Sequence, residues 1–410
     1  MKLIDIIEVF IAGDWGEETY SKETPCAVTC VRGADIIPIS EYDFSAIPVR
    51  YINQQAYAKK CLQVGDIIIE KSGGSPTQST GRVSLVSQEL LDHAGAVICS
   101  NFCTAFRVKK GWNPLYVYYY LQFIYNLGAF FNFEGKTSGI KNLQLDAAFA
   151  AIPIEDISES IQNNIVAILQ GLERKIAINR QINQNLEAMA KQLYDYWFVQ
   201  FDFPNEEGKP YKLSGGAMVW SEELKREIPC EWTTTTLGKE CEMYQPKTLG
   251  LSELDDNAQY KVYGANGVIG KFHSYNHEDS EIAMACRGNS CGIINRTAPF
   301  SWITGNAMVI KMRNSKIHNE YIKQALRYAN VAGAISGSGQ PQLTRENLSG
   351  VKLCKPIDEV LMKFTRLVSQ IVKLQLQNHS KIEFLIKQRD EFLPLLMNGQ
   401  VSVNSDLSDD

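Results

Sequence analysis

The sequence predicts an α+β protein in which two mixed α/β modules follow one another in tandem, each followed by a long helix. The two helices are expected to pair as an antiparallel coiled coil with pseudo-two-fold symmetry. Three observations support this fold class. The chain has 410 residues, enough for two ordinary hydrophobic cores. Its order of strands, loops and helices occurs twice, and each copy ends in a stretch with heptad spacing of apolar residues.

The internal repeat is visible in the order of the elements. A strand and a Gly-rich polar loop at 69–74 match 283–288, and an aromatic-rich helix begins at Tyr116 in the first copy and at Tyr321 in the second. A second Gly-rich loop follows each of these helices and precedes a long helix. The expected segments are 1–152 for the first module, 153–204 for the first long helix, 205–227 for a linker, 228–352 for the second module, 353–400 for the second long helix and 401–410 for an acidic disordered tail.

The two long helices carry apolar stripes that predict a coiled-coil seam. From Ile157 to Trp197 the first helix would be roughly 60 Å long at 1.5 Å per residue. Because this is too long for the face of one module, we favour helix pairing over simple coverage of a core. The first seam is predicted at Ile161, Ile165, Ile168, Leu172, Ile182, Leu186, Met189 and Leu193, with Lys175 and Asn179 as polar positions. The second is predicted at Phe364, Val368, Ile371, Leu385, Phe392 and Leu396, with Gln375 and Arg389 as polar positions.

Composition restricts the class of protein. A net charge of -5 and a pI near 5.7 argue against a protein that coats nucleic acid nonspecifically, because such a surface is normally basic. The sequence has no apolar run of about 18 residues and no basic start typical of a secretion signal, so we expect a cytoplasmic protein. The ten cysteines are then expected to be reduced. Two pairs, Cys26/Cys30 and Cys99/Cys103, leave a zinc site or buried structural thiols as alternatives, and we favour the second.

Polar loops in both copies carry side chains that suit nucleic acid. Hydroxyl and backbone N–H groups suit phosphate oxygens, whereas Arg, Gln and Asn side chains can contact base edges. Each loop alone would more simply be a surface turn, but similar loops with different side chains in both modules favour recognition of two short sequences. The candidate residues are Lys71, Ser75, Gln78, Arg82, Lys136 and Lys141 in the first module, and Arg287, Asn289, Ser290 and Gln340 in the second.

One cluster resembles a metal-dependent nuclease site, in which carboxylates hold Mg2+. It runs from Asp66 to Lys71. The repeat aligns Ser280 and Met284 with Asp66 and Glu70, so the second copy would lack this chemistry. Neighbouring Glu70 and Lys71 would also point to opposite faces of a strand. We therefore expect no catalytic site and no metal site in this chain.

Four stretches, taken together and in order, resemble the specificity subunits of Type I restriction-modification systems. They are QLYDYWFVQF at 192–201, IPCEW at 228–232, SGQPQL at 338–343 and FLPLLMNGQV at 392–401. The resemblance covers nearly the whole chain, and its specificity comes from the combination of these stretches.

This resemblance implies two target-recognition domains, each for one half of a split DNA target, with a coiled coil that sets the unread spacer. It implies double-stranded DNA, two methyltransferase (modification) subunits and restriction/translocase subunits as partners. S-adenosylmethionine, ATP and Mg2+ would be used by those subunits, with no cofactor and no catalysis in this chain. Exposed helix faces and the helix end at Trp197 would dock the partners. The alternative left open is a duplicated coiled-coil interaction scaffold that does not bind DNA.

Overall fold

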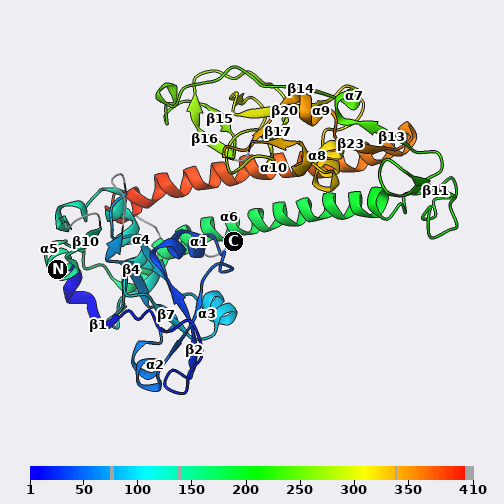
Figure 1. Cartoon of the computed structure of the whole chain (residues 1–410). Helices are drawn as coiled ribbons and strands as arrows, with labels where there is room; N and C mark the ends of the chain where they lie inside the picture. The colour runs from blue at the N-terminus through cyan, green and yellow to red at the C-terminus, as the bar shows by residue number, and fades with distance from the viewer. Residues whose placement is uncertain (74–77, 137–139, 338, 402–410) are drawn as a thin grey trace. The chain divides into compact units, whose positions relative to one another are not determined.

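The computed structural model describes residues 1–73, 78–136, 140–337 and 339–401. The chain forms two compact units. Unit 1 contains Met1–Asn179 and the segment that begins at Lys381, and unit 2 contains Arg180–Ser380. Each unit holds one mixed α/β module and a part of each long helix, as can be followed in Figure 1.

The central sheet of unit 1 is antiparallel and has both faces covered. Its strand order is β1 (Ile7–Ala12), β8 (Cys103–Val108), β4 (Ile67–Glu70) and β6 (Val83–Leu85). Along β4, Ile67 and Ile69 pack into a core that includes helix α4 (Pro114–Asn126), whereas Ile68 packs into a separate core on the other face. This alternation follows from the two-residue period of a strand, and burial on both faces explains why β4 is an unbroken apolar run.

Two smaller sheets complete the module of unit 1. In one, β2 (Cys26–Val31) pairs antiparallel with β3 (Val49–Ile52) and parallel with β7 (Val97–Cys99). In the other, β10 (Lys141–Leu143) lies between β5 (Ser72–Gly73) and β9 (Glu134–Lys136). The second of these sheets joins two loops that the sequence analysis selected separately.

Unit 2 repeats the plan of the central sheet and of the second sheet, and it adds two two-stranded sheets, β11 (Met218–Ser221) with β12 (Arg226–Pro229) and β13 (Thr233–Thr236) with β23 (Lys352–Lys355). Its central sheet has the order β14 (Cys241–Tyr244), β20 (Ala307–Met312), β17 (Ile282–Ala285) and β18 (Ile294–Arg296), again antiparallel. A second sheet has β15 (Tyr260–Gly264) between antiparallel β16 (Gly267–Phe272) and parallel β19 (Trp302–Ile303). A short hairpin of β21 (Ile335–Ser336) and β22 (Gln342–Leu343) follows helix α8 (Glu320–Tyr328). The predicted fold class and the duplication are confirmed.

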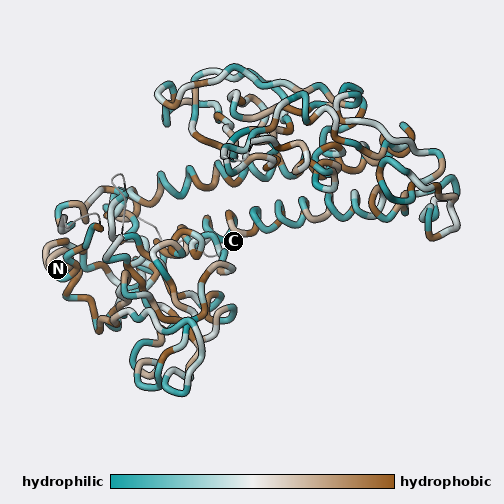
Figure 2. The backbone as a smooth tube through the Cα atoms, in the orientation of Figure 1, coloured by the Kyte–Doolittle hydropathy of each residue, from teal (hydrophilic) through white to brown (hydrophobic). Residues whose placement is uncertain are grey.

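The long helices are α6 (Glu159–Tyr194), which continues as a π-helical turn over Asp195–Val199, and α10 (Asp358–Met397). Figure 2 shows hydrophobic and hydrophilic residues alternating along both helices. None of the helices in the described part of the chain combines the length and apolar character needed to cross a bilayer.

The two helices run antiparallel within each unit. In unit 1, Ile165 of α6 belongs to the same apolar cluster as Leu396 of α10, and Ile176 to the same cluster as Ile382. Residue numbers therefore rise along one helix as they fall along the other. In unit 2, Ala190 and Tyr194 pack in one core with Phe364 and Val368, and Asn183 Nδ2 donates to the backbone oxygen of Gln375 at 3.4 Å. Pairing of the helices is thus built into both units.

At every second predicted position of the α6 seam, the buried residue is not the predicted one but the one that follows it. Ile161 and Ile182 are 46% and 41% exposed, and Met189 is also exposed, whereas the residues that follow them are buried. Those residues are Gln162, Asn183 and Ala190. Among the other apolar positions predicted on α6, two are buried and three are half-buried: Ile165 and Leu186, and Ile168, Leu172 and Leu193, respectively. Of the two polar positions, Asn179 is buried and Lys175 is exposed.

The error has a physical cause, because a polar residue can occupy this seam when its side chain is hydrogen-bonded, as Gln162 shows. The Gln162 side chain accepts from the backbone N–H of Asn113 at 2.7 Å and donates to the Ile157 oxygen at 3.0 Å. A pattern search for apolar residues therefore selects the neighbouring isoleucine instead. On α10 the prediction is wrong only at Phe392, which is 40% exposed while Leu393 is buried. The remaining predicted positions Phe364, Val368, Gln375, Leu385 and Leu396 are buried, and Ile371 and Arg389 are half-buried.

Each module is fastened to α6 by a carboxylate, but the chemistry differs between the units. In unit 2, Lys323 Nζ binds both Glu187 oxygens at 2.8 and 2.9 Å, and Arg327 Nη2 adds a contact at 2.6 Å. Burial would raise the pKa of Glu187, but these cations lower it to about 2. In unit 1, the Tyr119 hydroxyl donates to Glu173 at 2.6 Å, and burial raises the pKa of that carboxyl. The two modules have the same central strand order, but the side chains that join them to α6 differ.

The corrected seam can be tested by truncation on α6. Leu169 has no exposed surface, so Leu169→Ala should lower the free energy of unfolding by about 2–5 kcal/mol, measured by urea denaturation. Ile161→Ala, at the originally predicted position, should cost less than about 1 kcal/mol because its side chain is largely in water already. Equal losses in the two variants would contradict the corrected phase.

Candidate functional site

The two Gly-rich loops predicted in unit 1 meet at one small sheet. Asn142 of β10 pairs with Ser72 of β5, Lys141 pairs with Gly73, and the N–H of Leu143 donates to the Lys71 oxygen at 2.7 Å. On its other side β10 pairs with β9. The base of the first loop and both strands of the second therefore form a single structural feature, which we call the recognition hairpin of unit 1 (residues 71–73, 134–136 and 140–143).

Most of the predicted unit 1 residues surround this hairpin. Lys71 and Gln78 are half-buried beside it. Lys136 forms the end of β9. Ser75 lies outside the described residues, as does the tip of the second loop at 137–139. The structure thus brings together candidates that are far apart in the sequence.

Arg82 is engaged inside the module. Its Nε and Nη2 atoms donate to the two oxygens of Glu70 at 2.8 and 2.7 Å, and this hydrogen bonding raises the pKa of Arg82. The side chains of Glu70 and Arg82 are 3% and 16% exposed. Parallel contacts of this kind are among the stronger interactions between side chains. Arg82 therefore fixes the base of the first loop, a role that the sequence did not indicate.

Lys141 holds the other end of the same loop. Its Nζ contacts the Gln78 backbone oxygen at 3.2 Å and Glu134 Oε2 at 3.3 Å. The same carboxylate accepts hydrogen bonds from the backbone N–H and the hydroxyl of Thr80 at 2.6 and 3.0 Å. The charges of Arg82 and Lys141 are therefore compensated by the buried carboxylates of Glu70 and Glu134. These contacts order the described part of the loop.

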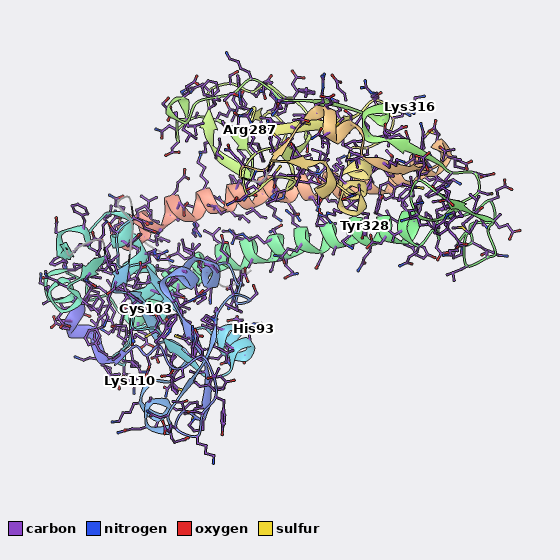
Figure 3. The ribbon with its side chains drawn as sticks, viewed as in Figure 1. His93, Cys103, Lys110, Arg287, Lys316 and Tyr328 are labelled. Atoms are coloured by element: carbon purple, nitrogen blue, oxygen red, sulfur yellow. The ribbon has the colours of Figure 1, made fainter. Side chains whose placement is uncertain are left out.

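Unit 2 has the same arrangement with different side chains. Arg287 forms an antiparallel bridge with Gln342, the N–H of Gly288 donates to the Pro341 oxygen at 3.0 Å, and the N–H of Leu343 donates to the Cys286 oxygen at 3.0 Å. We call residues 286–288, 335–337 and 339–343 the recognition hairpin of unit 2. The predicted residues Arg287, Asn289 and Gln340 are exposed and Ser290 is half-buried. Figure 3 labels Arg287 on this unit.

The nuclease-like cluster is a structural ion pair that occurs in both units. Asp66 is fully buried, and Arg107 donates to its two oxygens at 2.8 and 2.9 Å. In unit 2, Lys311 contacts Glu281 at 2.8 Å, and Lys311 is the fifth residue of β20 as Arg107 is of β8. Glu281 is thus the counterpart of Asp66.

The strand register also corrects the alignment of the two copies. Cys103 and Ala307 open equivalent strands, and they pair with Glu70 and Ala285 respectively. The alignment of Ser280 with Asp66 was therefore wrong by one residue, and the second copy retains the acidic residue. Its carboxylate serves the fold, because each acid is buried against a cation of the neighbouring strand.

The predicted Cys pairs lie in the core of unit 1. Cys30, Cys99 and Cys103 are buried, and burial raises the pKa of each thiol to about 12. Such thiols remain protonated at neutral pH, which favours the structural role over metal coordination. Cys26 is half-buried, and its thiol donates to Gln54 Oε1 at 3.1 Å.

A family model described as the Type I restriction modification DNA specificity domain matches residues 39–188, a range that contains the whole recognition hairpin of unit 1. Residues 39–188 form a Type I restriction-modification DNA specificity domain. The resemblance found in the sequence is thereby confirmed, and the paired loops of unit 1 lie within this domain.

Curated relatives agree with this assignment. The Type I restriction enzyme MjaIX specificity subunit of Methanocaldococcus jannaschii is 23% identical over 273 residues, which is 59% of this chain and 59% of the relative. The chain thus aligns with little more than half the length of that protein. The Type I restriction enzyme HindI specificity subunit of Haemophilus influenzae is 31% identical over 91 residues, 22% of this chain and 19% of that one.

A solved structure shares the fold of this specificity-domain protein. The crystal structure of the S subunit of a Type I restriction-modification system from M. genitalium has a TM-score of 0.57 and 15% sequence identity. The match covers 97% of this chain and 95% of that one. At this identity the likeness concerns the fold alone.

Sequence reasoning missed the residues that anchor and pair the hairpins. These are Glu70, Glu134, Ser72, Asn142 and Gln342. One signal was available, since Asn142 and Gln342 each precede a buried leucine, as expected for strands with one face on the core. The ion pairs gave no such signal, because they depend on strand register and not on spacing along the chain.

The buried pair at the loop base gives a stability test with an internal control. Glu70→Ala should lower the free energy of unfolding by about 3–5 kcal/mol, since it leaves Arg82 without its partner. In unit 2 the corresponding backbone pair is Ala285 and Ile293, whose N–H and oxygen form a hydrogen bond of 2.8 Å, as the N–H of Glu70 and the oxygen of Arg82 do at 2.9 Å.

The double variant Glu70→Ala/Arg82→Ile places the same apolar pair in unit 1. It should recover much of the free energy of unfolding that Glu70→Ala loses, measured by urea denaturation. If Glu70→Ala alone costs less than about 0.5 kcal/mol, the pair does not fix the loop.

Proposed function

We propose that this chain is the non-catalytic DNA-recognition subunit of a Type I restriction-modification complex and that each unit recognises one half of a bipartite target. The observation that carries the proposal is the recognition hairpin, built twice on the same strand frame with different exposed side chains. A protein that needed two copies of one activity would be expected to keep the same side chains in both. Two hairpins with distinct surfaces suit two different DNA sequences.

The acidic residues support a role in recognition without catalysis. Both oxygens of Asp66 are held by Arg107, and the oxygens of Glu281 are held by Lys311 and by Asn319 Nδ2 at 3.0 Å. Carboxylates occupied in this way are poor metal ligands. In our proposal, methyl transfer from S-adenosylmethionine and ATP- and Mg2+-dependent restriction belong to partner subunits in the cytoplasm.

The surface proposed for the modification subunits keeps the exposed helix faces of the sequence expectation but not the helix end at Trp197. Trp197 and Phe198 are each 4% exposed and pack in the core of unit 2, so this helix end is a structural anchor and not a docking surface. Large apolar side chains are instead exposed elsewhere on the two helices. They include Ile178, Ile182 and Met189 on α6, and Leu367, Leu374 and Phe384 on α10. Exposed apolar side chains of this kind suit protein partners.

The function is tested by the methylation pattern that the complex leaves in a genome. A host without other adenine methyltransferases, expressing this chain and its modification subunits, should carry N6-methyladenine in a motif of two short fixed parts separated by an unspecified spacer. Single-molecule sequencing measures this directly. The matched control is the same host with the modification subunits alone.

A continuous short motif would contradict recognition by two separate heads. Absence of any motif would favour the alternative, an interaction scaffold that does not bind DNA.

A further inference from the structure

One pair of residues occupies the same place in both recognition hairpins. Ser72 pairs with Asn142 in unit 1, and Arg287 pairs with Gln342 in unit 2. The backbone hydrogen bonds next to each pair are equivalent, from Leu143 to Lys71 in unit 1 and from Leu343 to Cys286 in unit 2. The two pairs are therefore matched by strand register and not only by sequence.

The geometry of the strands directs these side chains away from the core. Leu143 and Leu343, which follow the second member of each pair, are 6% and 1% exposed. Successive residues of a strand point to opposite faces, so Asn142 and Gln342 lie on the outer face, and both are exposed. Arg287 is exposed beside Gln342.

In unit 2 the pair combines two side chains that recognise purines. Within the described residues, Arg287 has neither an ion pair nor a side-chain hydrogen bond. A guanidinium can bind O6 and N7 of guanine with two hydrogen bonds, and a glutamine amide can bind N6 and N7 of adenine. Directly opposed residues of antiparallel strands lie about 4.5–5.5 Å apart, whereas neighbouring bases along a strand of DNA are about 3.4 Å apart. The long Arg287 and Gln342 side chains can converge from the wider spacing onto two neighbouring bases.

In unit 1 neither side chain of the equivalent pair, Ser72 and Asn142, carries a charge. The Ser72 hydroxyl and Asn142 Oδ1 lie 2.5 Å apart, so the hydroxyl donates to the amide oxygen and orients the amide. The nearby cations Arg82 and Lys141 are balanced by Glu70 and Glu134. An asparagine amide suits adenine in the same way as glutamine but has a shorter reach.

We propose that this cross-strand pair is the base-reading position of each unit, a specificity determinant that rests on the proposed function. Arg287 and Gln342 contact a guanine and a neighbouring adenine in one half-site. Asn142, positioned by Ser72, contacts an adenine in the other. Arg82 and Lys141 support the hairpin and are not base readers.

The test follows single-residue variants in the methylation assay described above. Arg287→Ala should relax one fixed guanine in one half of the motif, so that sites with other bases there gain methylation about 10-fold or more relative to wild type. Gln342→Ala should relax a neighbouring adenine in the same half. Asn142→Ala should relax an adenine in the other half and leave the first unchanged.

Matched controls come from each unit. Lys316→Ala removes an exposed cation from unit 2 at a place well separated from Arg287 in Figure 3, and Gln55→Ala removes an exposed amide from unit 1. Neither should change the motif. Because Arg287, Gln342 and Asn142 are exposed, thermal melting should be unchanged in all variants. If a variant methylates too little to score, selection of bound duplexes from a pool randomised in one half-site gives the same information.

The outcomes separate this inference from the proposed function. A bipartite motif in the wild type that stays fully fixed in Arg287→Ala and Asn142→Ala would overturn the base-reading pair and leave the function standing. Uniformly weaker methylation of all sites in Arg287→Ala, with no base relaxed, would make Arg287 a phosphate contact and also overturn it. Absence of a bipartite motif in the wild type would contradict both the proposed function and the base-reading pair.

Discussion

Burial of the helix seams is the constraint on which the rest of the structure depends. Helices of 36 and 40 residues with apolar stripes are stable in water only when those stripes are covered. In unit 1, Ile165 and Leu169 share a core with Leu396 of α10 and with residues of α4. In unit 2, Tyr194 packs with Phe364, with ring centroids 6.2 Å apart. Each module is therefore built onto a helix pair, and the position of its sheets follows from that packing.

The frame and the recognition hairpin differ in how similar they are between the two units. Strand order, the ion pair of Asp66 or Glu281, and the backbone bonds at the hairpin base are the same in both units. The exposed pair changes from Ser72 and Asn142 to Arg287 and Gln342. Since outward side chains at a strand pair contribute little to the core, they can change without loss of stability. In the proposed function, this separation would let one scaffold serve two half-sites.

The sequence was sufficient for the properties that depend on local pattern. The duplication, the two long helices and the Gly-rich loops follow from periodicity and composition, and the structure contains all of them. The phase of the first seam did not follow, because Gln162 and Asn183 are buried through hydrogen bonds that hydrophobicity does not reveal. Arg82 was predicted to be a DNA-binding cation because its partner is also not visible from local pattern. Its partner Glu70 lies twelve residues away along the chain and meets it only across two paired strands.

The central claim is that equivalent strand pairs in the two units contact the bases of two half-sites. The most direct measurement is an electron cryo-microscopy structure of the assembled complex on its target duplex, with the distances from the Arg287 guanidinium and the Asn142 amide to the bases. The account predicts hydrogen-bond distances of about 2.7–3.2 Å from each to base edges in separate half-sites. Both side chains facing solvent, or contacting only the phosphate backbone, would contradict it.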